Sequence, residues 1–403
     1  MSKVFIVSAK RTAIGSFLGS LSTVHPADFG GEVVKNILEE TKFPKCELDE
    51  VIVGNILPAG LGQGVGRQVS INAGIPKEVP AYSLNMDSGS GMKSIMNAYG
   101  NIKAGISNAI IAGGTENMSM APYLVNPKTR VGHKMGDLVA KDHMILDALT
   151  DSFNNVHMGI TAENIAELHS ITREDQDAFV MNSQNKAIKA VDEGRFNNEI
   201  VEIVIKNRRG DIIFKEDEYP NRITSVEKLA KLRAAFKKDG VVTAGNSSGI
   251  NDGASFMLVV SEEAVKKHKL TPLVEVVGIG QGGVDPLYMG LGPVPAIRKA
   301  LTHAELDLKD IDLLELNEAF AAQSLGVVNE LSKEHSISIE DIMNITNVNG
   351  GAIALGHPVG ASGNRIVTTL IHEMIKRKST YGLASLCIGG GMGTAVVLKR
   401  IGE

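Results

Sequence analysis

Cysteine is scarce in this sequence, and long apolar runs are missing from it. The two cysteines, Cys46 and Cys387, stand far apart, which suits a reducing compartment better than a disulfide scaffold. No run approaches the roughly 20 apolar residues that a membrane-spanning helix needs. The apolar N-terminal stretch is too short for a signal peptide, since charge returns at Lys10 and Arg11, and the last three residues are not a peroxisomal signal. We therefore expect a cytoplasmic protein with no membrane partner.

An excess of positive charge is also absent. The formal net charge of −5 argues against a nucleic-acid partner, which a basic protein binds more readily, but it leaves room for a local basic patch that holds a phosphorylated ligand. The chain has 403 residues, of which 43% are hydrophobic and 22% charged. This composition is typical of a soluble globular protein, and the length allows two or three domains.

Glycine, in contrast, is abundant, with 43 residues, and it is concentrated around His357. Residues 349–363 read Asn-Gly-Gly-Ala-Ile-Ala-Leu-Gly-His-Pro-Val-Gly-Ala-Ser-Gly, which predicts an apolar, irregular loop rather than a helix or a strand. A buried loop of this kind occurs where backbone approaches a ligand or where a side chain must be aimed. His357 is the aimed side chain, suited to acid/base work near neutral pH; a turn around a hydrogen-bonded core histidine is the alternative.

Apolar strands alternate with helices in both halves of the chain, which predicts an α/β fold with a sheet covered on both faces. In the first half we expect strands at 4–8, 51–54, 81–84 and 108–114, and helices at 25–40, 67–73 and 92–103. The second half echoes this order, because 311–316 resembles 48–53, 361–376 resembles 89–103, and 383–390 resembles 109–114. The echo favours duplication into two related α/β domains over chance similarity of buried strands.

The stretch from about residue 118 to 250 differs in character and predicts an insertion or lid rather than a continuation of the first sheet. Within it we expect a helix over 173–193, ended by Gly194, and a hairpin that joins 199–205 to 212–215. The predicted ranges are 1–118 for the first part of the N-terminal domain, 119–250 for the loop domain, 251–275 for the return to the N-terminal domain, and 276–403 for the C-terminal domain.

Further glycine-flanked loops carry candidate chemistry. Ser88 precedes a predicted helix, where the helix dipole and free N–H groups favour a nucleophile, although a helix-capping serine is the commoner use of such a position. Cys387 ends a predicted strand and is followed by Ile-Gly-Gly-Gly-Met-Gly, which leaves backbone exposed for a ligand. An inert buried thiol is the alternative for Cys387.

Four motifs resemble those of the thiolase family, in the family's order and over the whole chain. They are His157–Asn164, which resembles the substrate loop of the short-chain acetyl-CoA acetyltransferases, and Asn317–Ala321, Gly356–Pro358 and Cys387–Gly391. The resemblance implies a duplicated, five-layered α/β thiolase fold, with two βαβαβ-type domains and an inserted loop domain. It also implies acetyl-CoA, acetoacetyl-CoA and CoA as substrates and products, no permanently bound cofactor or metal, and a homotetramer with a candidate contact around 122–141.

One position departs from the family pattern. The family has a nucleophilic cysteine in an Asn-x-x-Cys-x-Ser-Gly motif, and the matching stretch Asn85–Gly91 has Ser88 at that place. A serine hydroxyl is far harder to deprotonate than a thiol of pKa about 8.5. Acyl transfer also becomes an exchange of a thioester for an ester, which is not isoenergetic. Because the other motifs are intact, we expect an engineered cysteine-to-serine variant with strongly reduced acyl transfer rather than a natural serine.

The resemblance implies a ping-pong reaction that condenses two acetyl-CoA into acetoacetyl-CoA and CoA, and its reverse. Residue 88 takes the acyl group and His357 takes its proton, while the N–H groups of Ser88 and Gly389 hold the thioester oxygen. Cys387 then removes the α-proton of the second acetyl-CoA, and His357 and a water positioned by Asn317 hold the enolate oxygen. The implied CoA contacts are Leu149, His157, Met158, Phe236, Ala244, Ser248, Ala319 and Phe320.

Other functions are also compatible with parts of this pattern. A 3-ketoacyl-CoA thiolase for longer chains is one alternative. A decarboxylating ketoacyl synthase would need a second histidine in place of Asn317, and a hydroxymethylglutaryl-CoA synthase would need a catalytic glutamate in the first half. A non-catalytic thiolase relative that binds CoA esters or lipids is supported by Ser88 alone.

Overall fold

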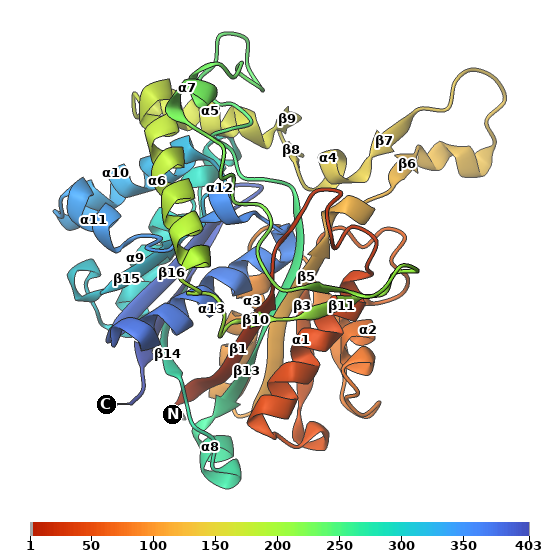
Figure 1. The fold of residues 1–403 in the computed structure, drawn as a ribbon, viewed down its shortest axis with the longest axis vertical. Coiled ribbons are helices and arrows are strands. Elements are labelled where there is room, and N and C mark those ends of the chain that lie inside the picture. Colours follow the sequence, from red (N-terminus) through yellow and green to blue (C-terminus); the bar gives the residue numbers. More distant parts are fainter. Residues whose placement is uncertain (1–2, 403) are drawn as a thin grey trace.

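The computed structural model describes residues 3–402, so Met1, Ser2 and Glu403, at the ends of the predicted domain ranges, lie outside it. Its main feature is a sheet of 11 strands, in which the long strands follow the order β15-β16-β17-β14-β1-β13-β5-β3-β4 (Figure 1). The strands are β1 (Val4–Thr12), β3 (Glu50–Gly54), β4 (Ala81–Leu84), β5 (Ala109–Asn117), β13 (Asn251–Ser261), β14 (Val274–Gly283), β15 (Leu313–Leu316), β16 (Tyr381–Ile388) and β17 (Met392–Arg400).

The two halves of this sheet have the same pairing pattern. In the first half β1 pairs with β13 and β13 with β5, both antiparallel, and then β5 with β3 and β3 with β4, both parallel. In the second half β14 pairs with β17 and β17 with β16, both antiparallel, and then β16 with β15, parallel. Both β1 and β14 carry a register shift, at Ile6/Ser8 and at Val276/Gly278. The predicted duplication is therefore confirmed, down to a shared irregularity of the first strand.

Helices cover the two half-sheets in three layers. The helices of the first half are α1 (Pro26–Thr41), α2 (Val65–Asn72), α3 (Ser90–Lys103) and α8 (Glu262–His268), and those of the second half are α9 (Pro293–Ala304), α10 (Ala321–His335), α11 (Ile339–Ile345), α12 (Ala352–Leu355) and α13 (Val359–Arg377). Helix α1 begins with Pro26 in its first turn, and the side chain of His25 caps it by accepting the N–H of Ala27. The three helices predicted in the first half are thus present, with ends displaced by at most two residues. Among residues 3–402, no helix combines the length and apolar character needed to cross a bilayer.

Three apolar cores alternate with the half-sheets and give the predicted five layers. One core packs α1 and α2 against the first half-sheet, and another packs α9 and α10 against the second. The third lies between the half-sheets and combines residues of α3, such as Met92, with residues of α13, such as Leu370. Neighbouring residues Ile110 and Ile111 of β5 belong to different cores, because successive side chains of a strand point to opposite faces. Both half-sheets are therefore covered on both faces.

The loop domain contains short strands and the long helix that the sequence predicted. Its elements are β6 (Tyr123–Val125), β7 (Ala140–Asp142), α4 (His143–Asp147), β8 (Thr150–Asp151), β9 (Val156–His157), α5 (Met158–Leu168), α6 (Arg173–Asp192), β10 (Ile200–Val201), β11 (Ile203–Ile205), β12 (Ile212–Phe214) and α7 (Val226–Ala230). Strands β11 and β12 form the predicted hairpin. The expectation that this stretch stays outside the first sheet is wrong at β10, which pairs in parallel with the end of β1. Strands β6 and β7 form an arm that projects from the rest of the molecule (Figure 1).

The prediction of an irregular loop over 349–363 is wrong for part of that segment. Residues 352–355 form α12, and α13 begins at Val359, inside the predicted loop, so that Gly360 and Gly363 lie inside a helix. A Cβ atom on Gly363 would lie 2.5 Å from the backbone nitrogen of Met92 in α3. Glycine therefore lets α13 and α3 approach closely, and that packing outweighs its low helix propensity. Residues 349–351 and the turn around His357 keep the predicted irregular backbone.

Candidate active site

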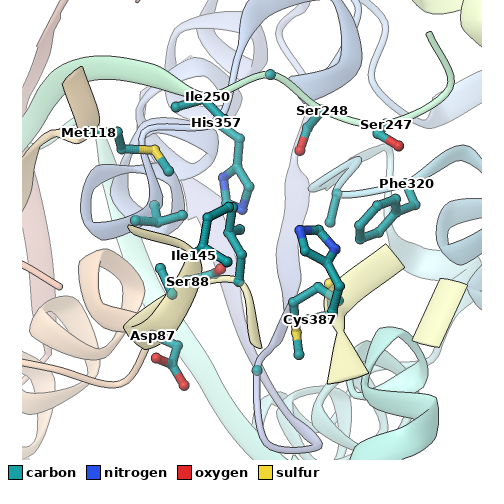
Figure 2. Close-up of a pocket in the computed structure, with 18 of the residues that line it drawn as sticks. Asp87, Ser88, Met118, Ile145, Ser247, Ser248, Ile250, Phe320, His357 and Cys387 are labelled. Atoms are coloured by element: carbon teal, nitrogen blue, oxygen red, sulfur yellow. The ribbon is translucent and has the colours of Figure 1, made fainter. Parts of the chain in front are cut away.

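A cavity of about 400 Å³ lies where the two half-sheets and the loop domain meet. Ser88 enters it from the turn between β4 and α3, His357 from the turn between α12 and α13, and Cys387 from the end of β16. Gly389, in the turn that follows β16, also lines it. Figure 2 shows Ser88, His357 and Cys387 around the same space. Residues from three separate parts of the chain thus converge at one point.

The cavity also gathers the residues that the family resemblance assigns to CoA. All the predicted site residues line it except Asn317. Asn317 is buried next to the site, and neither polar atom of its amide has a hydrogen-bond partner among the described residues. A buried amide in this condition is normally hydrogen-bonded to water. The predicted role of Asn317, positioning a water rather than touching the ligand, agrees with this placement.

The turn that carries Ser88 is held by its neighbours. Asp87 has a φ of 42°, in the left-handed region, and its N–H donates to the side-chain oxygen of Asn85 over 3.0 Å. The hydroxyl of Ser90 donates to the Asp87 carbonyl at 2.7 Å and accepts the N–H of Met86 at 2.8 Å. Helix α3 starts at Ser90, so Ser88 lies just ahead of the positive end of the helix dipole. A strained residue beside a candidate nucleophile is typical of an active site.

His357 is held in one orientation and one tautomer. Its backbone N–H donates to the Asn251 side chain at 2.9 Å, and its Nδ1 atom lies 2.5 Å from Oγ of Ser362. The Ser362 hydroxyl donates to the carbonyl of Pro358 at 2.9 Å, so its oxygen accepts a hydrogen bond from the N–H group at Nδ1 of His357, and the proton stays on Nδ1. The Nε2 atom is then unprotonated and free to act as a base. Burial, assisted by the charge of Arg365, lowers the pKa of His357 to about 4, which keeps the ring neutral at pH 7.

Cys387 is a buried thiol at the end of β16, and its neighbours in the sheet are fixed by the pairing with β17. Burial raises its pKa to about 12, so it carries its proton at neutral pH and becomes a strong base once that proton is removed. The following turn needs glycine, because Gly390 and Gly391 have φ values of 80° and 84°. This turn leaves the N–H of Gly389 near the cavity.

One wall of the cavity is aromatic. The rings of His157 and Phe236 stack with centroids 4.6 Å apart, and Phe236 meets Phe320 edge to face at 6.1 Å. Nδ1 of His157 accepts the N–H of Gly159 at 3.0 Å, which caps helix α5 and leaves Nε2 to carry the proton of the neutral ring. The opposite rim is a loop of small residues, in which the N–H of Ser248 donates to the carbonyl of Ala319 at 2.9 Å.

Comparison with known proteins decides the family. The thiolase N-terminal domain matches residues 4–263 and the thiolase C-terminal domain matches residues 270–400. The chain belongs to the thiolase family.

Its relatives are similar over their full length. It is 51% identical to the acetyl-CoA acetyltransferase of Syntrophomonas wolfei and 50% identical to that of Pseudomonas aeruginosa, with at least 99% of each chain covered. The solved structure of a Syntrophomonas wolfei acetyl-CoA acetyltransferase superposes with a TM-score of 0.96 at 41% identity, covering 100% of both chains. Human mitochondrial 3-ketoacyl-CoA thiolase in complex with CoA superposes with a TM-score of 0.93 at 42% identity, covering 100% of this chain and 98% of that one. The thiolase-family chain is thus an acyltransferase.

A buried carboxylate joins the two halves of this thiolase fold beneath the site. Glu116 accepts the N–H groups of Ile56, Leu57 and Gly360 at 2.9, 3.1 and 2.9 Å, and a side-chain N–H of Asn55 at 3.0 Å. Gly360 belongs to the first turn of α13, directly after His357, whereas Ile56 follows β3 and lines the cavity. Glu116 therefore fixes the His357 turn relative to the first half of the fold.

A second cavity, of about 550 Å³, adjoins the first. The two share Tyr219, Ala244 and Ser247 in their linings, and the second also contains Arg222 and Lys228. The first cavity holds the reactive groups, and the second holds cationic side chains. Because they share lining residues, the two cavities lie side by side.

Several residues of the thiolase cavity were not predicted from the sequence. They are Phe17, Ile56, Asp87, Met118, Ile145, Ala148, Tyr219, Ser247, Gly249, Ile250, Met289 and Val359. Asp87 and Val359 lie within predicted segments, so position alone could have indicated them, whereas Met118 directly follows β5, which is three residues longer than predicted. Phe17 and Tyr219 stand in segments with no motif, and only the folded chain brings them to the site.

Proposed function

We propose that this chain is an acetyl-CoA C-acetyltransferase, which condenses two acetyl-CoA into acetoacetyl-CoA and CoA and catalyses the reverse thiolysis. The observation that carries the proposal is the convergence of Ser88, His357, Cys387 and Gly389 on one cavity beside an aromatic wall. Carbon–carbon bond formation needs a nucleophile, a base for the α-proton and two places for oxyanions. These residues provide each of them.

In the first half-reaction, the hydroxyl of Ser88 attacks the thioester carbon of acetyl-CoA. Nε2 of His357 accepts the proton, because Ser362 already holds the proton on Nδ1. The N–H groups of Ser88 and Gly389 stabilise the oxyanion. The Cys387 thiol gives its proton to the leaving CoA sulfur and becomes a thiolate, while His357 keeps the proton that it took from Ser88.

In the second half-reaction, Cys387 as thiolate removes the α-proton of another acetyl-CoA. His357 and the water held by Asn317 stabilise the enolate oxygen, and the carbanion attacks the acyl group on Ser88. The bond between the acyl carbon and Ser88 Oγ breaks, and the Ser88 oxygen takes its proton back from His357. The raised pKa of Cys387 makes its thiolate a strong base, suited to a weakly acidic C–H. In thiolysis the protonated thiol returns that proton to carbon.

The two cavities together suit the length of a CoA ester. The pantetheine arm lies between the stacked His157–Phe236 pair and the Ser248 loop, with Leu149, Met158, Ala244, Ala319 and Phe320 as further contacts. The nucleotide end extends into the second cavity, where Lys228 offers charge to phosphate groups beside Arg222, which is paired with Asp192. No permanently bound cofactor is part of this proposal.

Ser88 makes the proposed acyl transfer slow, because His357 has too low a pKa to deprotonate a hydroxyl readily. In Ser88→Cys, we expect the kcat for thiolysis of acetoacetyl-CoA to rise by on the order of 10²-fold or more. His357→Asn in the same background is the matched control and should abolish the gain. If Ser88→Cys still binds CoA esters but turns none over, the chain is a binding protein and the proposal is wrong.

A longer-chain 3-ketoacyl-CoA thiolase is the second candidate. The observation that favours it is the close structural similarity to human mitochondrial 3-ketoacyl-CoA thiolase, together with a largely apolar cavity lining that includes Ile56, Met118 and Ile145. Thiolysis by Ser88→Cys, measured with 3-ketoacyl-CoA esters of increasing length, separates the two. A kcat/KM that falls with length supports the acetyl-specific enzyme.

We also propose that the protein assembles as a homotetramer through the arm formed by β6 and β7. The arm exposes large apolar side chains far from the core, among them Tyr123, Val131 and Met135, the last with 92% of its surface exposed. Exposed apolar surface of this kind is typical of a protein contact. Replacing residues 126–139 with a short glycine linker should reduce the mass measured by light scattering to that of a smaller oligomer.

A further inference from the structure

Arg365 is a buried cation in α13, the helix that begins two residues after His357. Only 2% of its surface is exposed, and none of its three guanidinium nitrogens has a hydrogen-bond partner among the described residues. A buried guanidinium is normally hydrogen-bonded on several sides, because removing an unpaired charge from water is very unfavourable. An unpartnered cation this close to the site points to a functional role.

The carboxylate that faces Arg365 does not cancel its charge. Nη1 of Arg365 lies 3.9 Å from Oε2 of Glu315, beyond hydrogen-bond length, and that oxygen has no hydrogen-bond partner either. Burial raises the pKa of Glu315 to about 8 against the pull of Arg365, and repulsion from Glu318, Glu199 and Glu373 adds to the rise. Glu315 is therefore mostly protonated at neutral pH. Burial also lowers the pKa of Arg365, but a guanidinium keeps its proton in proteins.

Three more charges act on Arg365, from β1 and from the loop domain. Arg11 donates to Glu199 at 2.6 Å and to Asp217 at 2.7 and 2.9 Å, so both carboxylates are bound to that arginine. Two carboxylates against one guanidinium leave one excess negative charge, which makes the burial of Arg365 less unfavourable without giving it a hydrogen-bonded partner. The guanidinium of Arg365 is thus not engaged by this group.

Strand β15 places Glu315 and Asn317 on the side of the sheet that holds α13. Leu313 of this strand belongs to the core between the half-sheets, whereas Leu314 belongs to the outer core. Because successive side chains of a strand alternate, Glu315 and Asn317 point into the same inner layer as Leu313. Arg365 meets Glu315 in that layer, one strand repeat (roughly 7 Å) from the amide that positions the proposed water.

His357 is also within the field of this cation. Burial, and after it the charge of Arg365, lowers the pKa of His357. We propose that Arg365 is a positioning residue, whose positive charge behind Asn317 and His357 favours the negative charge that forms on the enolate oxygen. A charge fixed in a buried region stabilises an oxyanion without having to move during the reaction. The inference rests on the proposed thiolase function, which supplies the enolate.

The first test needs no turnover. NMR signals of the His357 imidazole are followed in the whole protein from about pH 3.5 to 8. In Arg365→Gln, the pKa of His357 should rise from about 4 to about 5 or higher, because a repulsive charge is lost, whereas Arg365→Lys should keep it near 4. Arg298→Gln removes an exposed cation of α9 and, as the matched control, should change nothing. An identical titration in the unmodified chain and in a folded Arg365→Gln would overturn the proposal.

The second test measures thiolysis of acetoacetyl-CoA in the Ser88→Cys background. There Arg365→Gln should lower kcat by about 10²-fold with KM little changed, because the charge acts on the reacting group rather than on binding. Arg365→Lys, which keeps the charge, should recover most of this loss. A loss of the same size in Arg365→Lys would mean that shape rather than charge matters, and the proposal would be wrong.

Glu315→Gln provides a test that does not depend on Arg365→Gln being folded, since glutamine resembles a protonated carboxyl in shape. In the Ser88→Cys background, ionisation of Glu315 above about pH 8 should offset Arg365 and lower kcat, and Glu315→Gln should remove that decline. An unchanged decline would also overturn the proposal. If Ser88→Cys turns over nothing while the His357 titration shifts as expected, the thiolase function fails and the action of Arg365 on His357 stands.

Discussion

A Cβ atom on Gly159 would overlap the ring of Phe236, which stacks on His157. Helix α5 therefore needs glycine in its first turn so that the aromatic wall of the cavity can pack against it. Gly159 itself contacts no ligand in this proposal, but by allowing the close approach of Phe236 it determines the width of the proposed pantetheine channel.

Gly159→Ala should displace Phe236 and weaken CoA binding by on the order of tenfold, or about 1.4 kcal/mol. Isothermal titration calorimetry with CoA measures the effect. Gly100→Ala is the matched control, because Gly100 lies in helix α3 with no atom within 4 Å of a Cβ there. That change should leave CoA binding intact and stabilise the helix by up to about 1 kcal/mol. Equal CoA affinity in both variants would contradict the role of Phe236.

Removing the Ser362 hydroxyl should free His357 to adopt the wrong tautomer. In Ser362→Ala we expect kcat for CoA release from acetyl-CoA to fall at least about tenfold with KM little changed, because a positioning residue acts on the reacting group rather than on binding. Nitrogen NMR of the imidazole should show loss of the Nδ1-protonated form. Ser362→Thr keeps a hydroxyl and should keep that form. An unchanged tautomer in Ser362→Ala would refute the assignment.

Asp87 should make stability depend on pH. Burial raises its pKa from 3.8 to about 6, so the folded state holds the proton more tightly than the unfolded chain. Its favourable contribution is therefore complete below pH 3.8 and is lost as the pH rises through 6. A difference of about two pKa units corresponds to about 3 kcal/mol. Asp87→Asn, which tolerates the left-handed backbone, should raise the free energy of unfolding at pH 8 by this order of magnitude and by about half as much at pH 5.

Urea unfolding at the two pH values measures this effect. Asp137→Asn, at an exposed position of the projecting arm, is the control and should show no comparable difference. Equal stabilisation by Asp87→Asn at both pH values would mean that the carboxyl is not destabilised by burial.

Glu116→Gln should destabilise the folded protein, although glutamine has nearly the same shape as glutamate. Both carboxyl oxygens of Glu116 accept N–H groups, so the Gln amide nitrogen must face donors whichever way it turns. We expect a loss of about 2–3 kcal/mol in the free energy of unfolding, since buried donors lose their acceptor. Exposed Glu39→Gln should be neutral. A neutral Glu116→Gln would show that these hydrogen bonds do not hold the halves together.

The sequence was sufficient to predict the α/β class and the duplication, because both depend on local signals. Alternating apolar strands and helices predicted the layers, and glycine-flanked motifs indicated His357 and Cys387. The prediction of a loop over 349–363 was wrong in part because it considered only the low helix propensity of glycine. The close approach of α13 to α3, which is the reason for Gly360 and Gly363, is a tertiary contact with no local signal.

The residues that position the reactive side chains could not be predicted from the sequence either. Glu116 and Ser362 act on His357 through contacts that only the folded chain creates, one of them across 244 residues of sequence. Phe17 and Tyr219 reach the cavity from segments that no motif marks. Chemistry-bearing residues are recognisable by type and spacing, whereas the residues that orient them are recognisable only by position in space.

The place of β1 in the sheet has a consequence for synthesis. Both of its long neighbours, β13 and β14, begin at Asn251 or later, so the first strand to leave the ribosome has no long partner until more than half of the chain exists. At typical translation rates this interval lasts on the order of tens of seconds. Throughout it the nascent chain presents an unpaired, apolar strand, which is the kind of segment that chaperones bind and that aggregates when they are saturated.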